Sequence, residues 1–179
     1  MNYSITVTLR PLFVVIIALL IPTFIAMVII DQELKVATAP YGIISLELCG
    51  YDYSSCEAIL EDWGEEGKAM AMLSLGLDYL FMVLYPIAIC FGLLLALPNL
   101  SGKIRRITLV LAWVSLLSIP LDAVENIALI HVVLGLSGQM YSILGSYFAT
   151  AKLLINGATI AWLIIAVVMS LIRKQHSTN

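Results

Sequence analysis

Four long apolar stretches constrain this chain more than any other feature. They cover about residues 11–30, 69–97, 107–135 and 141–172, and roughly 20 apolar residues suffice for a helix to cross a bilayer. With 61% hydrophobic and 12% charged residues, the chain departs from the composition of water-soluble domains. The runs do not alternate as the strands of a membrane barrel do. The sequence therefore predicts an all-α polytopic membrane protein, a four-transmembrane-helix bundle forming a single membrane domain over residues 1–179.

The basic residues predict the orientation of this bundle. Lys and Arg concentrate in cytoplasmic flanks, which places both termini and the loop at residues 101–106 in the cytoplasm. The residues that carry this prediction are Arg10, Lys103, Arg105, Arg106, Arg173 and Lys174. A pattern at Ala37-Thr38-Ala39 leaves the alternative that the first stretch is a cleaved signal sequence. The last three stretches exceed the bilayer thickness, so we expect tilting, or kinks at Pro86 and Pro120.

The segment 31–68 forms a long, acidic extracytoplasmic loop with structure of its own. Residues 40–49 are mostly apolar and are expected to lie on or dip into the outer interface. Ser54 and Glu57 have capping-box spacing ahead of a short helix over residues 56–63. The loop holds nine of the twelve acids: Asp31, Glu33, Glu47, Asp52, Glu57, Glu61, Asp62, Glu65 and Glu66. We expect a solvated acidic surface that can dock a protein partner, in preference to a calcium site, because the acids lack an EF-hand pattern.

Two of the three cysteines lie in this outward loop. Cys49 and Cys56 are predicted to form a disulfide in an oxidising compartment, whereas Cys90 lies inside an apolar stretch and is interpreted as an ordinary apolar residue. A redox-active pair is the alternative, but the chain has no C-x-x-C motif.

Ionisable residues inside the apolar stretches are the main candidates for function, because they are costly in a membrane. Asp78, Asp122, Glu125 and Lys152 are all expected roughly 15–20 Å below the outer surface, counting ~1.5 Å per residue. Asn126 lies on the same helical face as Asp122 and Glu125. In the same way Tyr85 follows Asp78, and Asn156 follows Lys152.

Three acids and one lysine cannot all stay ionised cheaply in this setting. We expect Asp122 and Glu125, one turn apart, to share a proton. Lys152 is expected to form a salt bridge with Asp78 or Glu125. These residues define a candidate ligand- or proton-binding site that comprises Asp78, Tyr85, Asp122, Glu125, Asn126, Lys152 and Asn156.

Several functions fit this pattern. The leading one is binding or transport of a small molecule or proton through an intramembrane polar cavity. The polar residues can instead be structural, fixing the register of the helices. A non-catalytic subunit or immunity-type protein that docks a partner through its acidic loop is another alternative, and an intramembrane lipid-modifying enzyme is the last. We expect a protein that is not an enzyme, with no catalytic residues.

Three motifs resemble those of a group of small bacterial four-helix integral membrane proteins. They are Thr-Ala-Pro-Tyr-Gly-Ile-Ile-Ser-Leu-Glu at 38–47, Leu-Asp-Tyr-Leu-Phe-Met-Val-Leu-Tyr at 77–85 and Leu-Asp-Ala-Val-Glu-Asn at 121–126. The resemblance implies the four-helix layout and a place in the inner membrane of a bacterial cell, and no particular activity. The sequence has no nucleotide-binding motif and no cluster of metal ligands, so we expect no cofactor, no metal and no nucleic-acid partner, and the lipid bilayer as its surroundings.

Overall fold

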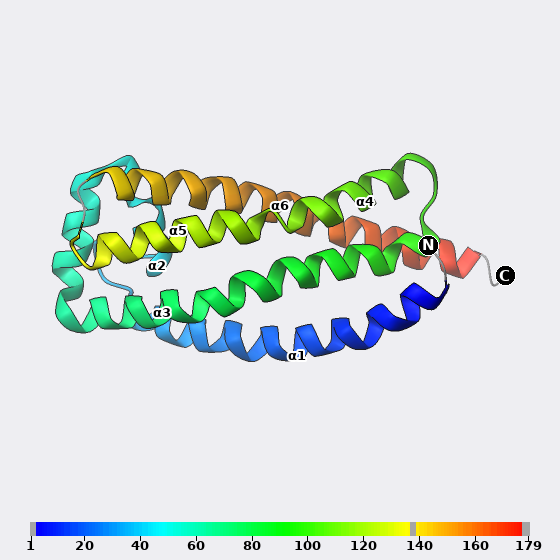
Figure 1. The fold of residues 1–179 in the computed structure, drawn as a ribbon, viewed down its shortest axis with the longest axis horizontal. Helices are drawn as coiled ribbons and strands as arrows, with labels where there is room; N and C mark the ends of the chain where they lie inside the picture. The colour runs from blue at the N-terminus through cyan, green and yellow to red at the C-terminus, as the bar shows by residue number, and fades with distance from the viewer. Residues whose placement is uncertain (1–2, 137–138, 177–179) are drawn as a thin grey trace. The chain divides into compact units, whose positions relative to one another are not determined.

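The computed structural model describes residues 3–136 and 139–176, which fold into helices and connecting turns (Figure 1). No strand occurs in these ranges. Ser137 and Gly138 of the loop between the last two predicted helices lie outside the described residues, as does the side chain of Lys174. In chain order the elements are α1 Tyr3–Glu33, α2 Ile43–Leu48, η1 Cys49–Tyr51, α3 Tyr53–Ala96, η2 Leu97–Asn99, α4 Gly102–Ser115, α5 Ser118–Val133 and α6 Gln139–His176.

Four helical segments in the described part of the chain are long and apolar enough to cross a membrane. They are Thr8–Glu33, Ser54–Asn99, Gly102–Val133 and Gln139–Arg173, with 26, 46, 32 and 35 residues. Many of their apolar side chains are exposed, Val14 and Ile164 among them at 65% and 61%. Such exposure in a water-soluble protein would be costly, and it indicates a multi-pass membrane protein.

The third of these segments is interrupted between α4 and α5. Leu116 and Leu117 form a turn in which each N–H donates to the carbonyl three residues earlier. Pro120 follows in the first turn of α5, where its missing N–H costs no hydrogen bond, but its ring excludes the carbonyl four residues before it. The helix therefore stops at Ser115 and restarts at Ser118.

The proline of α3 behaves differently. α3 continues through Pro86, and its non-helical backbone lies at Gly64, with φ 54° and ψ −160°. A positive φ at this position is strained for residues other than glycine. The short helix expected over residues 56–63 is therefore the first part of α3, and Gly64 joins it to the membrane-spanning part.

The predicted capping box at the start of this helix is wrong. The helix begins at Tyr53, so Ser54 lies within its first turn. The Ser54 and Ser55 hydroxyls both donate to the Asp52 carboxylate at 2.8 Å. These hydrogen bonds hold the pKa of Asp52 below its usual value.

The chain forms two compact units, each with its own core. Unit 1 comprises residues 1–20, 83–118 and 154–179, and unit 2 comprises residues 21–82 and 119–153. The core of unit 1 includes Leu93, Ala112 and Ala166, all fully buried. The core of unit 2 includes Leu34 and Leu46, also fully buried.

Within unit 2 the second half of α1 lies beside α3 (Figure 1). The Phe24 and Phe81 rings stack there with their centroids 6.0 Å apart. Nearer the end of α1, the Trp63 indole N–H donates to the Leu34 carbonyl at 2.8 Å. Apolar packing and this hydrogen bond together hold the first part of α3 over the end of α1.

Candidate functional site

Three carboxylates surround the ammonium group of Lys152 in unit 2. Nζ lies 2.9 Å from Asp122 Oδ1 and 4.0 Å from Glu47 Oε2. Both Glu125 oxygens are close to Nζ, Oε1 as a hydrogen-bond acceptor at 2.9 Å and Oε2 at 2.8 Å without hydrogen-bond geometry. We call Glu47, Asp122, Glu125 and Lys152 the carboxylate cluster.

The cluster is shielded from its surroundings. The side chains of Asp122 and Glu125 are 1% and 0% exposed, that of Lys152 is 9% and that of Glu47 is 14%. Charges removed from water in this way are stable only when they are paired and hydrogen-bonded. One ammonium faces three carboxylates, so full ionisation would leave two uncompensated negative charges.

Helix geometry explains the positions of three residues of the carboxylate cluster. Asp122 and Glu125 are three residues apart on α5 and share one face. Lys152 is the fourteenth residue of α6, about 20 Å along the helix from Gln139 at ~1.5 Å per residue. The predicted pair with Glu125 is present. Asp78 makes a different contact, because its Oδ2 accepts a hydrogen bond from Asn126 Nδ2 at 2.7 Å.

The remaining carboxylate comes from the segment between the first two spans. The expectation of a solvated acidic surface is wrong for Glu47, because α2 places its carboxylate next to Lys152. The sequence contains one signal of this position: Glu47 is the single acid in the apolar run of residues 43–48, within a segment expected to dip into the interface. Hydropathy alone does not predict which charged side chain of another helix Glu47 contacts.

The N-terminus of α2 is held by the end of α1. The Ile43 N–H donates to Asp31 Oδ1 at 2.8 Å, so a carboxylate meets the positive end of this short helix. Gly42, with φ 59°, directly precedes α2, and a Cβ there would overlap the Asp31 carboxylate. Asp31 is thus a structural acid, 23% exposed, and not part of an open acidic surface.

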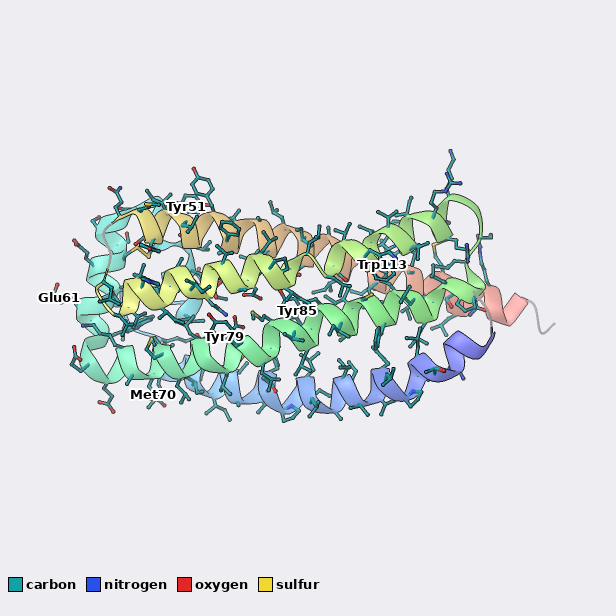
Figure 2. All side chains as sticks on the ribbon, viewed as in Figure 1. Tyr51, Glu61, Met70, Tyr79, Tyr85 and Trp113 are labelled. Atoms are coloured by element: carbon teal, nitrogen blue, oxygen red, sulfur yellow. A yellow bond between two sulfur atoms is a disulfide. The ribbon has the colours of Figure 1, made fainter. Side chains whose placement is uncertain are left out.

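The C-terminus of α2 is held by α6. The Ser146 hydroxyl donates to the Glu47 carbonyl at 2.7 Å and accepts a hydrogen bond from the Gly50 N–H at 2.8 Å. The Tyr51 hydroxyl lies 2.6 Å from Thr150 Oγ1, beside the start of α6 as Figure 2 shows. A Cβ at Gly50 would overlap the Ser142 carbonyl. The backbone of η1 therefore packs directly against α6, which fixes the position of Glu47.

Burial raises the pKa of the Glu47 carboxyl above its usual value. The nearby charges of Asp122 and Asp31 add to the rise, whereas the Lys152 ammonium and a hydrogen bond with Glu125 oppose it. A carboxyl whose pKa is raised holds its proton to higher pH than it does in water. The arrangement is therefore suited to taking up and releasing a proton at Glu47.

Two of the predicted site residues lie in unit 1. Asn156 Nδ2 donates to the Tyr85 hydroxyl at 2.9 Å, and Asn156 Oδ1 accepts from the Ser118 hydroxyl at 2.6 Å. This polar contact joins α3, α5 and α6 within that unit. Tyr85 is labelled in Figure 2.

Unit 2 contains the predicted disulfide. Cys49 and Cys56 are bonded, which confirms the pairing, and Cys90 is a free, buried cysteine. The disulfide connects η1, directly after α2, to the first turn of α3. Among the residues that the structure describes, no group of His, Cys, Asp or Glu side chains forms a candidate metal site.

Five exposed acids gather on the first part of α3, namely Glu57, Glu61, Asp62, Glu65 and Glu66. Glu33 and Asp52 are also exposed but lie outside this helix. Ile59 and Trp63, on the opposite face of the same helix, are 2% and 5% exposed. Figure 2 labels Glu61 on this acidic face.

Comparison of the chain with protein-family models, with curated proteins and with solved structures gave no match. The resemblance to small bacterial four-helix membrane proteins therefore stays an interpretation of three short motifs.

Proposed function

We propose that this chain is a multi-pass membrane protein of the inner membrane that binds and releases a proton, or a small cationic solute in its place, at the carboxylate cluster. One observation carries the proposal: three carboxylates converge on a single ammonium where no side chain is more than 14% exposed. The surplus negative charge favours any bound positive charge. A purely structural ion pair needs one acid for one base, and the additional acids have no such purpose.

The position of Glu47 supplies a route to the cluster. Asp122, Glu125 and Lys152 belong to membrane-spanning segments, whereas Glu47 belongs to α2, which lies between two of them. A proton that enters from the side of α2 meets Glu47 first. Transfer to the α5 carboxylates then requires no movement of the long helices, only exchange between acids that share the Lys152 ammonium.

The test is direct detection of a carboxyl that titrates in the membrane. Infrared difference spectroscopy of the purified protein in lipid vesicles, between about pH 5 and about pH 9, should show a protonated-carboxyl band that changes with pH. Glu47→Gln should remove a large part of this change, whereas Glu61→Gln on the exposed acidic face serves as the matched control and should leave it unaltered. The absence of a titrating band in the wild-type protein would refute the proposal.

Transport is tested separately from binding. Vesicles with an internal pH indicator and an imposed pH gradient report proton flux, and Asp122→Asn and Glu125→Gln are expected to reduce it. If both variants lose abundance in the membrane, the cluster is structural. Normal abundance together with lost flux supports the proposed function.

A second candidate function is favoured by the acidic face of α3. Five exposed acids on one short stretch attract basic surfaces, and a protein partner with such a surface would dock there. Of the five, Asp62 accepts a hydrogen bond from Thr38, and Glu65 pairs with Lys68. Neutralising Glu57, Glu61 and Glu66 should release a co-purifying basic protein, and co-purification that survives the change would count against docking.

A further inference from the structure

The charges of unit 1 are entirely of one sign. Its three segments contain Arg10, Lys103, Arg105, Arg106, Arg173 and Lys174 and not one Asp or Glu. Since no acid within the unit pairs with these basic residues, they can attract anions from outside it. The headgroups of anionic lipids provide such charge at the surface of a bilayer.

A groove of about 300 Å³ opens on the surface of the same unit. Its lining comes from three helices, with Phe13 on α1, Gly92 and Leu95 on α3, and Leu163, Val167 and Leu171 on α6. Gly92 lacks a side chain, and a Cβ there would lie 3.0 Å from the nearest Leu163 methyl. The groove is therefore narrow and apolar, which suits a hydrocarbon chain and not a polar molecule.

One end of the groove is polar and basic. Ser170 lines it and accepts a hydrogen bond from Asn99 Nδ2 at 2.8 Å. Arg173 follows Ser170 by three residues on α6, so the two share a face. Its Nη1 donates to the Ser101 hydroxyl at 2.6 Å, which leaves the rest of the guanidinium for another acceptor.

A second arginine lies at the same end of the unit. Arg10 is exposed and precedes Phe13 by three residues on α1, which places it one turn, about 4.5 Å, closer to the N-terminal end of that helix. Phe13 of α1 and Leu171 of α6 line the same groove, so the N-terminal part of α1 and the C-terminal part of α6 lie close together within unit 1 (Figure 1). The arginine donors and the apolar groove thus follow one another along the surface in the order of a headgroup and an acyl chain.

We propose that this groove binds an anionic phospholipid, with one acyl chain between Phe13, Gly92 and Val167 and the phosphate at Arg173 and Arg10. A zwitterionic phospholipid would also fill the groove, but its choline ammonium offsets the phosphate charge and leaves the arginines without a net counter-charge. Free phosphate would pair with the arginines but leave the groove empty. An anionic phospholipid satisfies both requirements.

Native mass spectrometry of the full-length protein in detergent tests the proposal. The probe is dioleoyl phosphatidylglycerol, titrated against dioleoyl phosphatidylcholine, which has the same chains, and against inorganic phosphate. We expect tighter retention of phosphatidylglycerol than of phosphatidylcholine, and no competition from phosphate. Equal binding of the two lipids, or displacement by phosphate, would overturn the proposal, as would a dimer whose interface occupies the groove.

Paired variants localise the site. Arg173→Gln should weaken phosphatidylglycerol binding about fivefold, the effect of one basic residue near an anionic membrane surface, whereas Arg106→Gln on α4, which does not line the groove, should change it less than about twofold. Val167→Phe should obstruct the chain, and Val168→Phe, on the neighbouring exposed residue, is its control. If Val167→Phe does not fold, Gly92→Ala narrows the same groove more gently. Equal effects of each variant and its control would refute the assignment.

Discussion

Replacing Lys152 by methionine removes the single positive charge of the carboxylate cluster while keeping an unbranched side chain of similar length. Asp122 and Glu125, 1% and 0% exposed, then face each other without a counter-charge. Glu47, whose Oε2 lies 4.0 Å from Nζ, loses its partner as well. The three acids must then take up protons or separate.

The size of the effect follows from the geometry. At an effective dielectric constant of about 20, unit charges 2.9 Å apart attract by about 6 kcal/mol, and the desolvation of each group offsets much of this. Removing one partner of a buried pair typically costs about 3–5 kcal/mol, because the other charge stays buried and unpaired. In a chain of this size that corresponds to a fall in Tm of roughly 6–20 °C.

The effect should also depend on pH. Without Lys152 the cluster's carboxylates have no counter-charge, and lowering the pH relieves their repulsion by protonation. Lys152→Met should therefore lose less stability at about pH 5 than at about pH 8. Adding Glu125→Gln to the same chain should recover part of the loss at the higher pH. This recovery separates charge repulsion from a simple packing defect.

Thermal unfolding in detergent, followed by tryptophan fluorescence, measures these changes. Lys68→Met is the matched control, because Lys68 pairs with Glu65 at 3.1 Å, with side chains 32% and 95% exposed, and exposed pairs contribute little. If Lys152→Met lowers Tm no more than Lys68→Met, or by the same amount at both pH values, the argument that the cluster holds surplus negative charge is wrong.

Three further predictions concern α2 and its attachments. Raising the pH through the raised pKa of Glu47 should weaken the docking of α2. A carboxyl with a raised pKa stabilises the folded form at low pH, and this stabilisation is lost as the carboxyl ionises. Hydrogen exchange of α2 should therefore speed up, and Glu47→Gln should abolish the change. Reducing or replacing the Cys49–Cys56 disulfide, with its sequence separation of 7, should cost about 2–3 kcal/mol of stability, measured by thermal unfolding with and without reductant. Gly50→Ala should push η1 away from the Ser142 carbonyl and speed exchange of α2 at every pH, unlike the effect of ionising Glu47; unchanged exchange would show that the close approach to α6 is unimportant.

Several elements followed from local patterns in the sequence. Hydropathy predicted membrane-spanning helices because an apolar helix satisfies its own backbone hydrogen bonds. Pro120 predicted an irregular position because the cause of the helix break is local: its ring excludes the carbonyl of the residue four positions earlier. The sequence pattern did not predict the non-helical backbone at Gly64, although its positive φ ends the short helix there. The helical pattern resumes directly after Gly64, so the interruption is not visible in the pattern.

The candidate site was predictable only in part. Asp122 and Glu125 share a face by helical periodicity alone, and a lysine at matching depth is a natural partner. The choice between Asp78 and Glu125 as that partner depends on how the helices rotate against one another, and the structure pairs Asp78 with Asn126. The rotation of a helix about its own axis is decided by its packing against other helices, and hydropathy does not predict it.

The sequence by itself determined the apolar spans, the disulfide partners and the presence of costly charges within the spans, because each depends on composition and on spacing along one segment. The tertiary structure alone decided that Glu47 belongs with Lys152. These residues are far apart in sequence, and they meet because Asp31 holds one end of α2 and Ser146 and Gly50 hold the other against α6. Contacts of this kind arise from the shape of the packed chain, which no single segment specifies.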